Sequence, residues 1–187
     1  MQTHYFLAVS LPPLVKDTLS EWIEQQKHKL SFQSWVHRDD YHITLAFLGN
    51  ADPLILPALQ DEMEKLASYF ASFSLTLQGL HTFGATERPR ILWAGVTETK
   101  ELFALQQDVH RFCTTHGFSL ETRPYRPHIT LARRWKSEAD LAADMLPNLE
   151  TDALHSLSFS VGKIGLYKTN LDRTPKYEEV YSVVLRK

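Results

Sequence analysis

The pentapeptide His-Ile-Thr-Leu-Ala occurs twice in the sequence, beginning at His42 and at His128. β-Branched and apolar residues in so short a run predict a β-strand. Because side chains alternate along a strand, His42 and Thr44 should share one face and Phe47 the other. His128 and Thr130 take the same places in the second copy. Two such strands facing each other could supply an acid, a base and two hydrogen-bond donors for a phosphate.

A single His-x-Thr pair on a strand is most simply explained by a half-buried histidine that a neighbour satisfies. Two copies at equivalent positions favour an active site instead, because apolar residues would stabilise a core better than repeated polar pairs. Histidine also exchanges protons near neutral pH. Of the other histidines only His81, close to Phe83 at the end of an alternating strand, is expected to line the same site.

Other chemistries fit the sequence less well. Zinc usually takes three or four protein ligands, and although Asp39 and Asp40 lie near His42, no acidic residue accompanies His128. The only cysteine, Cys113, falls within a predicted buried helical face, and there is no Gly-x-Ser-x-Gly motif. The seven glycines form no phosphate-binding loop. We therefore expect neither a metal nor a cofactor.

A cluster of basic residues surrounds the second motif, with no acidic residue among them: Arg123, Arg126, Arg133, Arg134 and Lys136. Some of them would simply be solvated. Strand alternation puts Arg133 on the face opposite His128, so Arg133 reaches the site only if the strand bends or ends there. Tyr125 and Arg126 precede the strand and are candidates for lining a substrate groove.

The composition is that of a soluble globular protein, with 187 residues, 43% hydrophobic and 22% charged. A net charge of -2 argues against coating long nucleic acids, although one RNA end needs only a local basic site. No apolar run approaches the roughly 20 residues that span a bilayer. The first residues lack the pattern of a signal peptide. We expect a cytoplasmic protein without membrane association.

A shift of 86 residues carries the first motif onto the second and reveals a longer repeat. The order strand, helix, motif strand, helix, strand occurs twice. The predicted strands cover 5–10, 91–96, 73–78 and 157–161, and a final strand over 180–185 has no counterpart. The predicted helices begin at Pro13, Thr99, Pro53 and Ser137, and the last of them ends at Pro147. This order predicts one domain of two similar lobes, about 1–88 and 89–187, with one motif on each wall of a central groove.

The paired motif resembles the signature of the two-histidine phosphoesterases. The closer resemblance is to the LigT-like RNA 2′,3′-cyclic phosphodiesterases, historically called 2′-5′ RNA ligases. The segments that carry it are FLAVSLPP, HITLAFLG, RILWAGV and RPHITLAR. The resemblance implies an α+β fold, bilobal and pseudo-two-fold, in which antiparallel sheets line a central groove and helices lie outside.

The resemblance also implies residue roles. His42 would be the proton donor and His128 the proton acceptor, while Thr44, Thr130 and Arg133 would bind the phosphate. One departure concerns the serine and glycine that the family often has before a tyrosine near the C-terminus. Here Thr169 stands for the serine and the glycine is missing.

The sequence thus predicts metal-independent hydrolysis of RNA 2′,3′-cyclic phosphodiester ends to 2′-phosphomonoesters. The expected partners are RNA ends or small nucleotides bearing a cyclic phosphate, bound by a monomer. Two alternatives remain open. A 2′-5′ RNA ligase would run similar chemistry in reverse, with a ribose hydroxyl in place of water. A non-catalytic nucleotide-binding module is the other, and the intact histidines and threonines argue against it.

Overall fold

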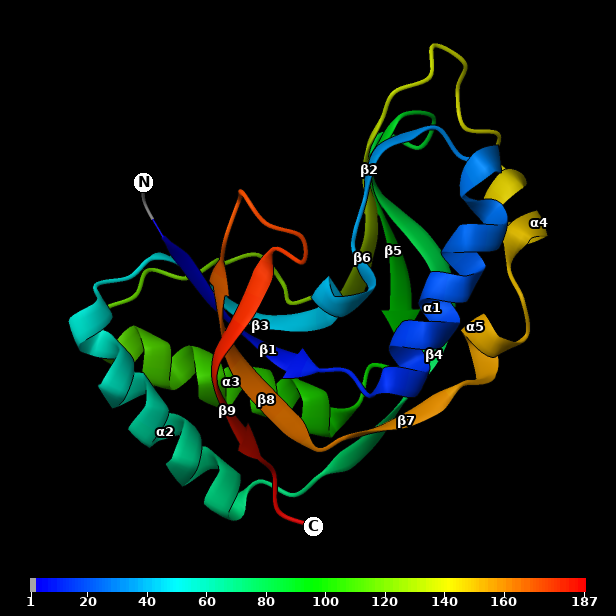
Figure 1. Cartoon of the computed structure of the whole chain (residues 1–187). Coiled ribbons are helices and arrows are strands. Elements are labelled where there is room, and N and C mark those ends of the chain that lie inside the picture. The colour runs from blue at the N-terminus through cyan, green and yellow to red at the C-terminus, as the bar shows by residue number, and fades with distance from the viewer. Residues whose placement is uncertain (1–2) are drawn as a thin grey trace.

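A computed structural model describes residues 3–187, whose strands form two antiparallel sheets. The four-stranded sheet has the order β3-β1-β8-β9 and the five-stranded sheet the order β2-β6-β5-β4-β7 (Figure 1). We call them the His42 sheet and the His128 sheet. The strands are β1 (His4–Ser10), β2 (Phe32–Trp35), β3 (His42–Asn50), β4 (Phe73–Gly84), β5 (Pro89–Val96), β6 (His128–Trp135), β7 (Ser158–Val161), β8 (Lys163–Thr169) and β9 (Tyr177–Val184).

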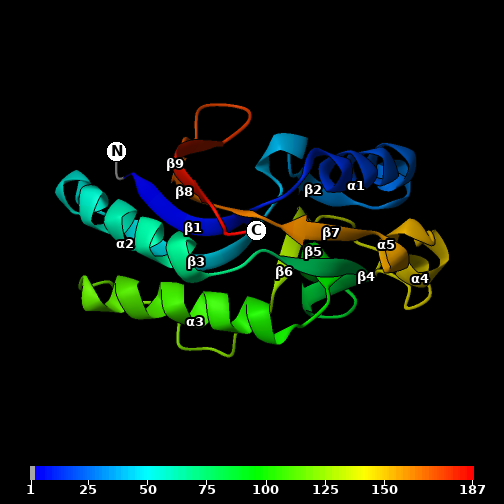
Figure 2. The same cartoon turned by 90° about the horizontal axis from the view of Figure 1, so that it is seen from below.

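Helices cover the outer face of each sheet. The helices are α1 (Pro13–Gln26), α2 (Leu56–Tyr69), α3 (Lys100–Thr115), α4 (Met145–Leu149) and α5 (Ala153–Ser156), with single 3-10 turns at Lys27–Lys29, Arg38–Asp40 and Pro53–Ile55. Helices α2 and α3 lie side by side beneath the His42 sheet, whereas α1, α4 and α5 lie on the side of the His128 sheet (Figures 1 and 2). No helix within residues 3–187 is long and apolar enough to cross a membrane.

Local sequence explains the first helix of each half of the repeat. Helix α1 starts at Pro13, whose ring presets the helical φ, and its apolar face is buried as predicted. Helix α3 is capped by Thr99, whose Oγ1 accepts a hydrogen bond from the N–H of Leu102. Cys113 lies buried on α3, and burial raises the pKa of its thiol to about 12. The prediction that this cysteine is packed in the core is confirmed.

Each sheet contains strands from both halves of the sequence. The predicted division into lobes of about 1–88 and 89–187 therefore does not coincide with the two sheets. Strands β1 and β3 pair with β8 and β9, whereas β2 and β4 join β5, β6 and β7. The hairpin from β4 to β5 explains the exchange, because strands joined by a short connection pair antiparallel. One cluster of buried apolar side chains includes residues from both sheets.

Both motif strands contain a β-bulge at the same place. Leu45 in β3 and Leu131 in β6 are each an extra residue relative to the neighbouring strand, and the alternation of side chains inverts beyond them. Phe47, predicted to face the core, is consequently 55% exposed. The same inversion brings Arg133, its counterpart in β6, round to the face of His128.

The helix predicted from Ser137 to Pro147 is wrong. Ser137 caps a turn instead, because its Oγ accepts a hydrogen bond from the N–H of Ala139. Only Leu141 of this stretch is buried, so there is too little apolar surface to hold a helix there. Pro147 falls in the first turn of the short helix α4, where its missing N–H costs nothing.

Candidate active site

His42 and His128 stand at the first positions of β3 and β6, and their imidazoles are anchored in the same way. The Nδ1 of His42 lies 2.7 Å from the carbonyl oxygen of Asp40, and the Nδ1 of His128 lies 2.7 Å from that of Arg126. A carbonyl can only accept, so each Nδ1 carries the proton and donates it. This fixes both tautomers and leaves both Nε2 atoms for a ligand. The Oγ1 of Thr44 lies 3.1 Å from the Nε2 of His42.

Aromatic rings hold the plane of each imidazole. Around His42, ring centroids of Phe6, Tyr177 and Tyr167 lie at 4.7, 5.1 and 6.3 Å. Around His128, those of Phe83 and Trp93 lie at 5.0 and 5.7 Å. Trp93 also lies against His81, with the ring centroids 4.6 Å apart and the ring planes tilted by 33°, so His81 lies on this wall as expected. The other rings were not predicted, because they come from strands that carry no motif.

Tyr125 joins the two motifs instead of lining an open groove. Its hydroxyl donates a 3.0 Å hydrogen bond to the carbonyl oxygen of Thr44, and its ring packs against the core. The segment before His128 is thereby tied to the strand of His42. Arg126 is exposed, and its guanidinium lies 5.9 Å from the ring centroid of Phe83.

Asp40 is a buried carboxylate that organises the His42 side. Its two oxygens accept hydrogen bonds, each 2.9 Å long, from the N–H groups of Lys176 and Tyr177. Asp40 is 4% exposed. The residue therefore binds the His42 ring through its carbonyl and the β8–β9 hairpin through its side chain. The described residues hold no group of three or more potential metal ligands. Both carboxylate oxygens of Asp40 accept backbone hydrogen bonds, so this residue has a structural role.

Ser10 and Tyr167 add hydroxyls to the same wall. Their oxygens lie 2.5 Å apart, and the Tyr167 hydroxyl also donates to Glu179. Burial raises the pKa of Tyr167, so the phenol stays protonated at neutral pH. Thr169, which stands for the family serine, lies at the end of β8 opposite Tyr177. No pattern in the sequence connected Ser10 with residues so distant along the chain.

Burial lowers the pKa of both catalytic candidates. The pKa of His42 falls to about 4, first because burial disfavours the charged imidazolium and then because His128, Arg133 and Lys16 add positive charge nearby. The pKa of His128 is lowered by burial and by Arg133, although the Arg126 carbonyl opposes the shift. Both imidazoles are therefore neutral at pH 7 in the free protein. Arg133 therefore adds positive charge to the surroundings of both histidines.

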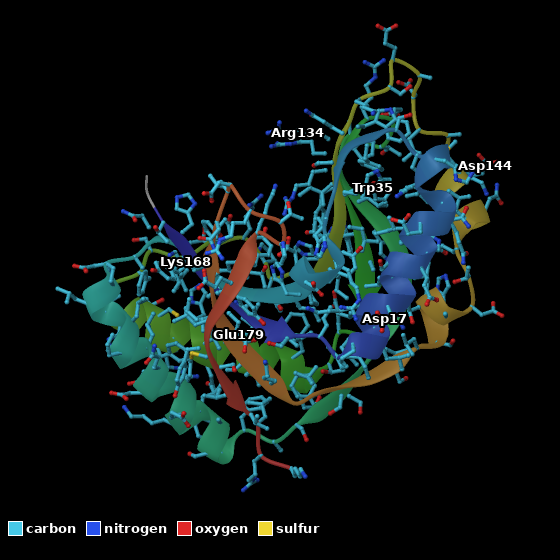
Figure 3. The ribbon with its side chains drawn as sticks, viewed as in Figure 1. Asp17, Trp35, Arg134, Asp144, Lys168 and Glu179 are labelled. Atoms are coloured by element: carbon cyan, nitrogen blue, oxygen red, sulfur yellow. The ribbon has the colours of Figure 1, made fainter. Side chains whose placement is uncertain are left out.

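The remaining basic residues differ in their surroundings. Arg123 forms a 2.6 Å ion pair with Glu121 and belongs to a solvated loop. Arg134 has a φ of 61°, in a left-handed region that is uncommon for residues other than glycine. Its side chain extends from β6 toward the opening between the sheets, and Lys168 lies on β8 in the facing sheet (Figure 3). Positive charge is thus present on both sides of this opening.

Comparison with known proteins agrees with this architecture. A family model described as the 2′-5′ RNA ligase superfamily matches residues 15–173. A Geobacillus stearothermophilus protein named RNA 2′,3′-cyclic phosphodiesterase is 45% identical over 179 residues, which are 96% of this chain and 56% of that protein. The chain thus spans little more than half the length of that relative. A Bacillus subtilis protein of the same name is 32% identical over 185 residues, covering 99% of this chain and 98% of its own.

Solved structures show the same fold. Escherichia coli LigT complexed with 3′-AMP has a TM-score of 0.79 at 21% identity, and both chains are covered completely. TT0787 of Thermus thermophilus has a TM-score of 0.77 at 24% identity, with 98% of each chain covered. The predicted α+β fold with two antiparallel sheets is confirmed. Since the family model matches most of the chain and two relatives exceed 30% identity along nearly all of it, the chain belongs to the 2′-5′ RNA ligase superfamily.

Proposed function

We propose that this protein is an RNA 2′,3′-cyclic phosphodiesterase in which His42 and His128 act as acid and base without a metal. The observation that carries the proposal is the matched anchoring of the two imidazoles. Each donates Nδ1–H to a backbone carbonyl two residues earlier, so both present Nε2 to a ligand. The names of the relatives at 45% and 32% identity support the same activity.

In the proposed reaction the cyclic phosphate lies between the two histidines. The Nε2 of neutral His128 takes a proton from water as the water oxygen bonds to phosphorus. The bond from phosphorus to O3′ breaks, and protonated His42 donates its Nε2 proton to that oxygen. Attack and departure occur on opposite sides of phosphorus, so one histidine serves each apical position.

The charge that builds on the non-bridging oxygens needs donors already in place. Thr44 and Thr130 supply hydroxyls from the same faces as the two histidines, and Arg133 supplies a positive charge after the bulge of β6. Arg126 and Tyr125 are positioning residues in this scheme. The carbonyl of Arg126 holds His128, and the hydroxyl of Tyr125 holds the strand of Thr44.

We also propose that the substrate is an RNA end or a small nucleotide bearing a 2′,3′-cyclic phosphate, and that a monomer binds it in the cytoplasm. Cys113 is free and buried, and a chain without a disulfide suits a reducing compartment. Size-exclusion chromatography with light scattering and cell fractionation test these two points directly.

A product-resolved assay tests the function. A short RNA ending in a 2′,3′-cyclic phosphate is incubated with the protein, with and without an RNA carrying a 5′-hydroxyl, and the products are identified by phosphorus NMR. We expect mainly the 2′-phosphomonoester in both mixtures. A 3′-phosphate or an equal mixture of isomers would mean that the roles or the RNA orientation are wrong. A joined 2′-5′ product would identify a ligase, and no turnover of any cyclic phosphate would identify a binding module.

A further inference from the structure

The two sheets differ at the strand that lies two positions from the histidine strand, which is β8 in the His42 sheet and β4 in the His128 sheet. In the His42 sheet, β8 is paired along its whole length with β9. The equivalent part of β4, to which the 86-residue shift leads, has β5 on one side only, because β7 pairs just with residues 73–76. In the part of the chain that the structure describes, the outer edge of β4 over residues 78–84 therefore has no strand beside it.

The difference changes what surrounds the histidines. In the His42 sheet, Tyr177 of β9 places its ring edge against His42. In the His128 sheet, the ring that lies edge-on to His128 is that of Phe83 in β4, and a cavity of about 820 Å³ lies beside this sheet. The edge of β4 and the face of β5 line one side of the cavity and the segment 141–147 lines the other. This volume lies within the range of small-molecule binding sites.

The cavity reaches the catalytic wall through aromatic side chains. Trp93 lines it and also contacts His128, with the ring centroids 5.7 Å apart. His81, which also lines it, packs against Trp93 and donates its Nε2–H to the carbonyl of Gln78. The Nε1 of Trp93 has no hydrogen-bond partner among residues 3–187, so ring packing alone holds this indole. The ring thus connects the cavity to the proposed base.

The charge of the cavity indicates what it would bind. Arg126 and Glu98 are the only charged residues in its lining, and their charges cancel. Most of the remaining polar lining comes from amide and hydroxyl groups such as Gln78, Thr82 and Thr86. A second phosphate would find little net positive charge there. A nucleobase, which is flat, neutral and rich in hydrogen-bonding atoms, fits an aromatic wall with neutral polar groups.

We propose that this cavity is a second nucleoside subsite, next to the phosphate site on the His128 side. The inference rests on the proposed phosphodiesterase function for the placing of the phosphate. The occupant is either the nucleotide that precedes the cyclic phosphate in the same RNA or a separate nucleoside. Both have the same recognition chemistry, and different substrates distinguish them.

The test fills the cavity from its far wall, away from the histidines. Ala143→Trp and Ala142→Trp introduce an indole into the segment opposite β4, and Ala104→Trp on the exposed surface of α3 is the matched control. The substrates are adenosine 2′,3′-cyclic phosphate and the dinucleotide that extends it by one 5′ nucleotide. Titration calorimetry with the corresponding 2′-phosphates measures binding without turnover, and circular dichroism checks folding.

We expect the unmodified protein to bind and turn over the dinucleotide about 5- to 150-fold more efficiently than the mononucleotide, the usual worth of one stacked base. Ala143→Trp and Ala142→Trp should remove this advantage and leave the mononucleotide unchanged. If a separate nucleoside occupies the subsite, the dinucleotide has no advantage, but free adenosine binds to the unmodified protein and to Ala104→Trp and not to the filled variants.

Two results would overturn the proposal. One is equal affinity for both 2′-phosphates together with no binding of adenosine. The other is a filled variant that weakens mononucleotide and dinucleotide to the same extent. Turnover of neither cyclic phosphate would instead refute the phosphodiesterase function, and the binding measurements would still decide whether the subsite exists.

Discussion

Binding of an anion should protonate His42. With a pKa of about 4, the imidazole of the free protein carries a proton in only about one molecule in a thousand at pH 7. Protonating it at that pH therefore costs about 4 kcal/mol, since each pKa unit corresponds to about 1.4 kcal/mol. An acid that supplies a proton to O3′ needs this cost to be offset by the substrate.

A bound phosphate can offset it. Two unit charges about 4 Å apart attract by about 4 kcal/mol at an effective dielectric constant near 20. The attraction equals the cost, so a monoanion beside the Nε2 of His42 should raise its pKa to near 7. Arg133 and a protonated His128 would oppose the rise, which is why neutral His128 suits the role of base in the same complex.

Carbon-detected or proton–carbon NMR of the histidine Cε1 positions measures this shift. The titration runs from pH 3.5 to 8 with and without sulfate, an anion that does not itself titrate in this range. His42→Gln identifies the signal of His42, and the signal of exposed His28 serves as the control for non-specific salt effects. We expect the midpoint of His42 to rise by at least about three pH units when sulfate binds, because sulfate carries two negative charges and the estimate is for one.

A free-protein midpoint near 6.5, or a midpoint that sulfate leaves unchanged, would refute this reasoning. Stability gives an independent check. The unfolded chain takes up a proton at His42 near pH 6.5, whereas the folded protein does so only near pH 4. The free energy of unfolding should therefore decrease as the pH falls through this window, and His42→Gln should remove part of the decrease.

Three further predictions follow from the site. His42→Ala and His128→Ala should each lower turnover about 10²- to 10⁴-fold, the usual worth of a positioned acid or base, while calorimetry shows a smaller change in phosphate affinity; near-normal turnover in either variant would contradict the assignment. Asp40→Ala should lower the free energy of unfolding in urea by about 1–3 kcal/mol for each N–H left unpaired at Lys176 and Tyr177, and unchanged stability would show that water replaces the carboxylate. Turnover should be unaffected by EDTA, and a loss that a divalent ion restores would establish a metal-dependent reaction.

The sequence by itself determined the elements that depend on local pattern. The two His-x-Thr strands and the helices at Pro13 and Thr99 are where the repeat and its apolar spacing predicted them. Such a pattern could not predict that each motif strand contains one extra residue. The bulges at Leu45 and Leu131 become visible only when each strand is paired with its neighbour, and they decide that Arg133 faces the site.

Only the tertiary structure decided which side chains surround the histidines. Asp40 and Tyr177 are far apart along the chain, and so are Ser10 and Tyr167, yet each pair is joined by a hydrogen bond in the site. Such contacts depend on the order of strands in the sheets, which the repeat left undetermined because both halves contribute to both sheets. Which neighbour a strand pairs with decides which side chains face each other across the groove, and the local sequence does not determine that pairing.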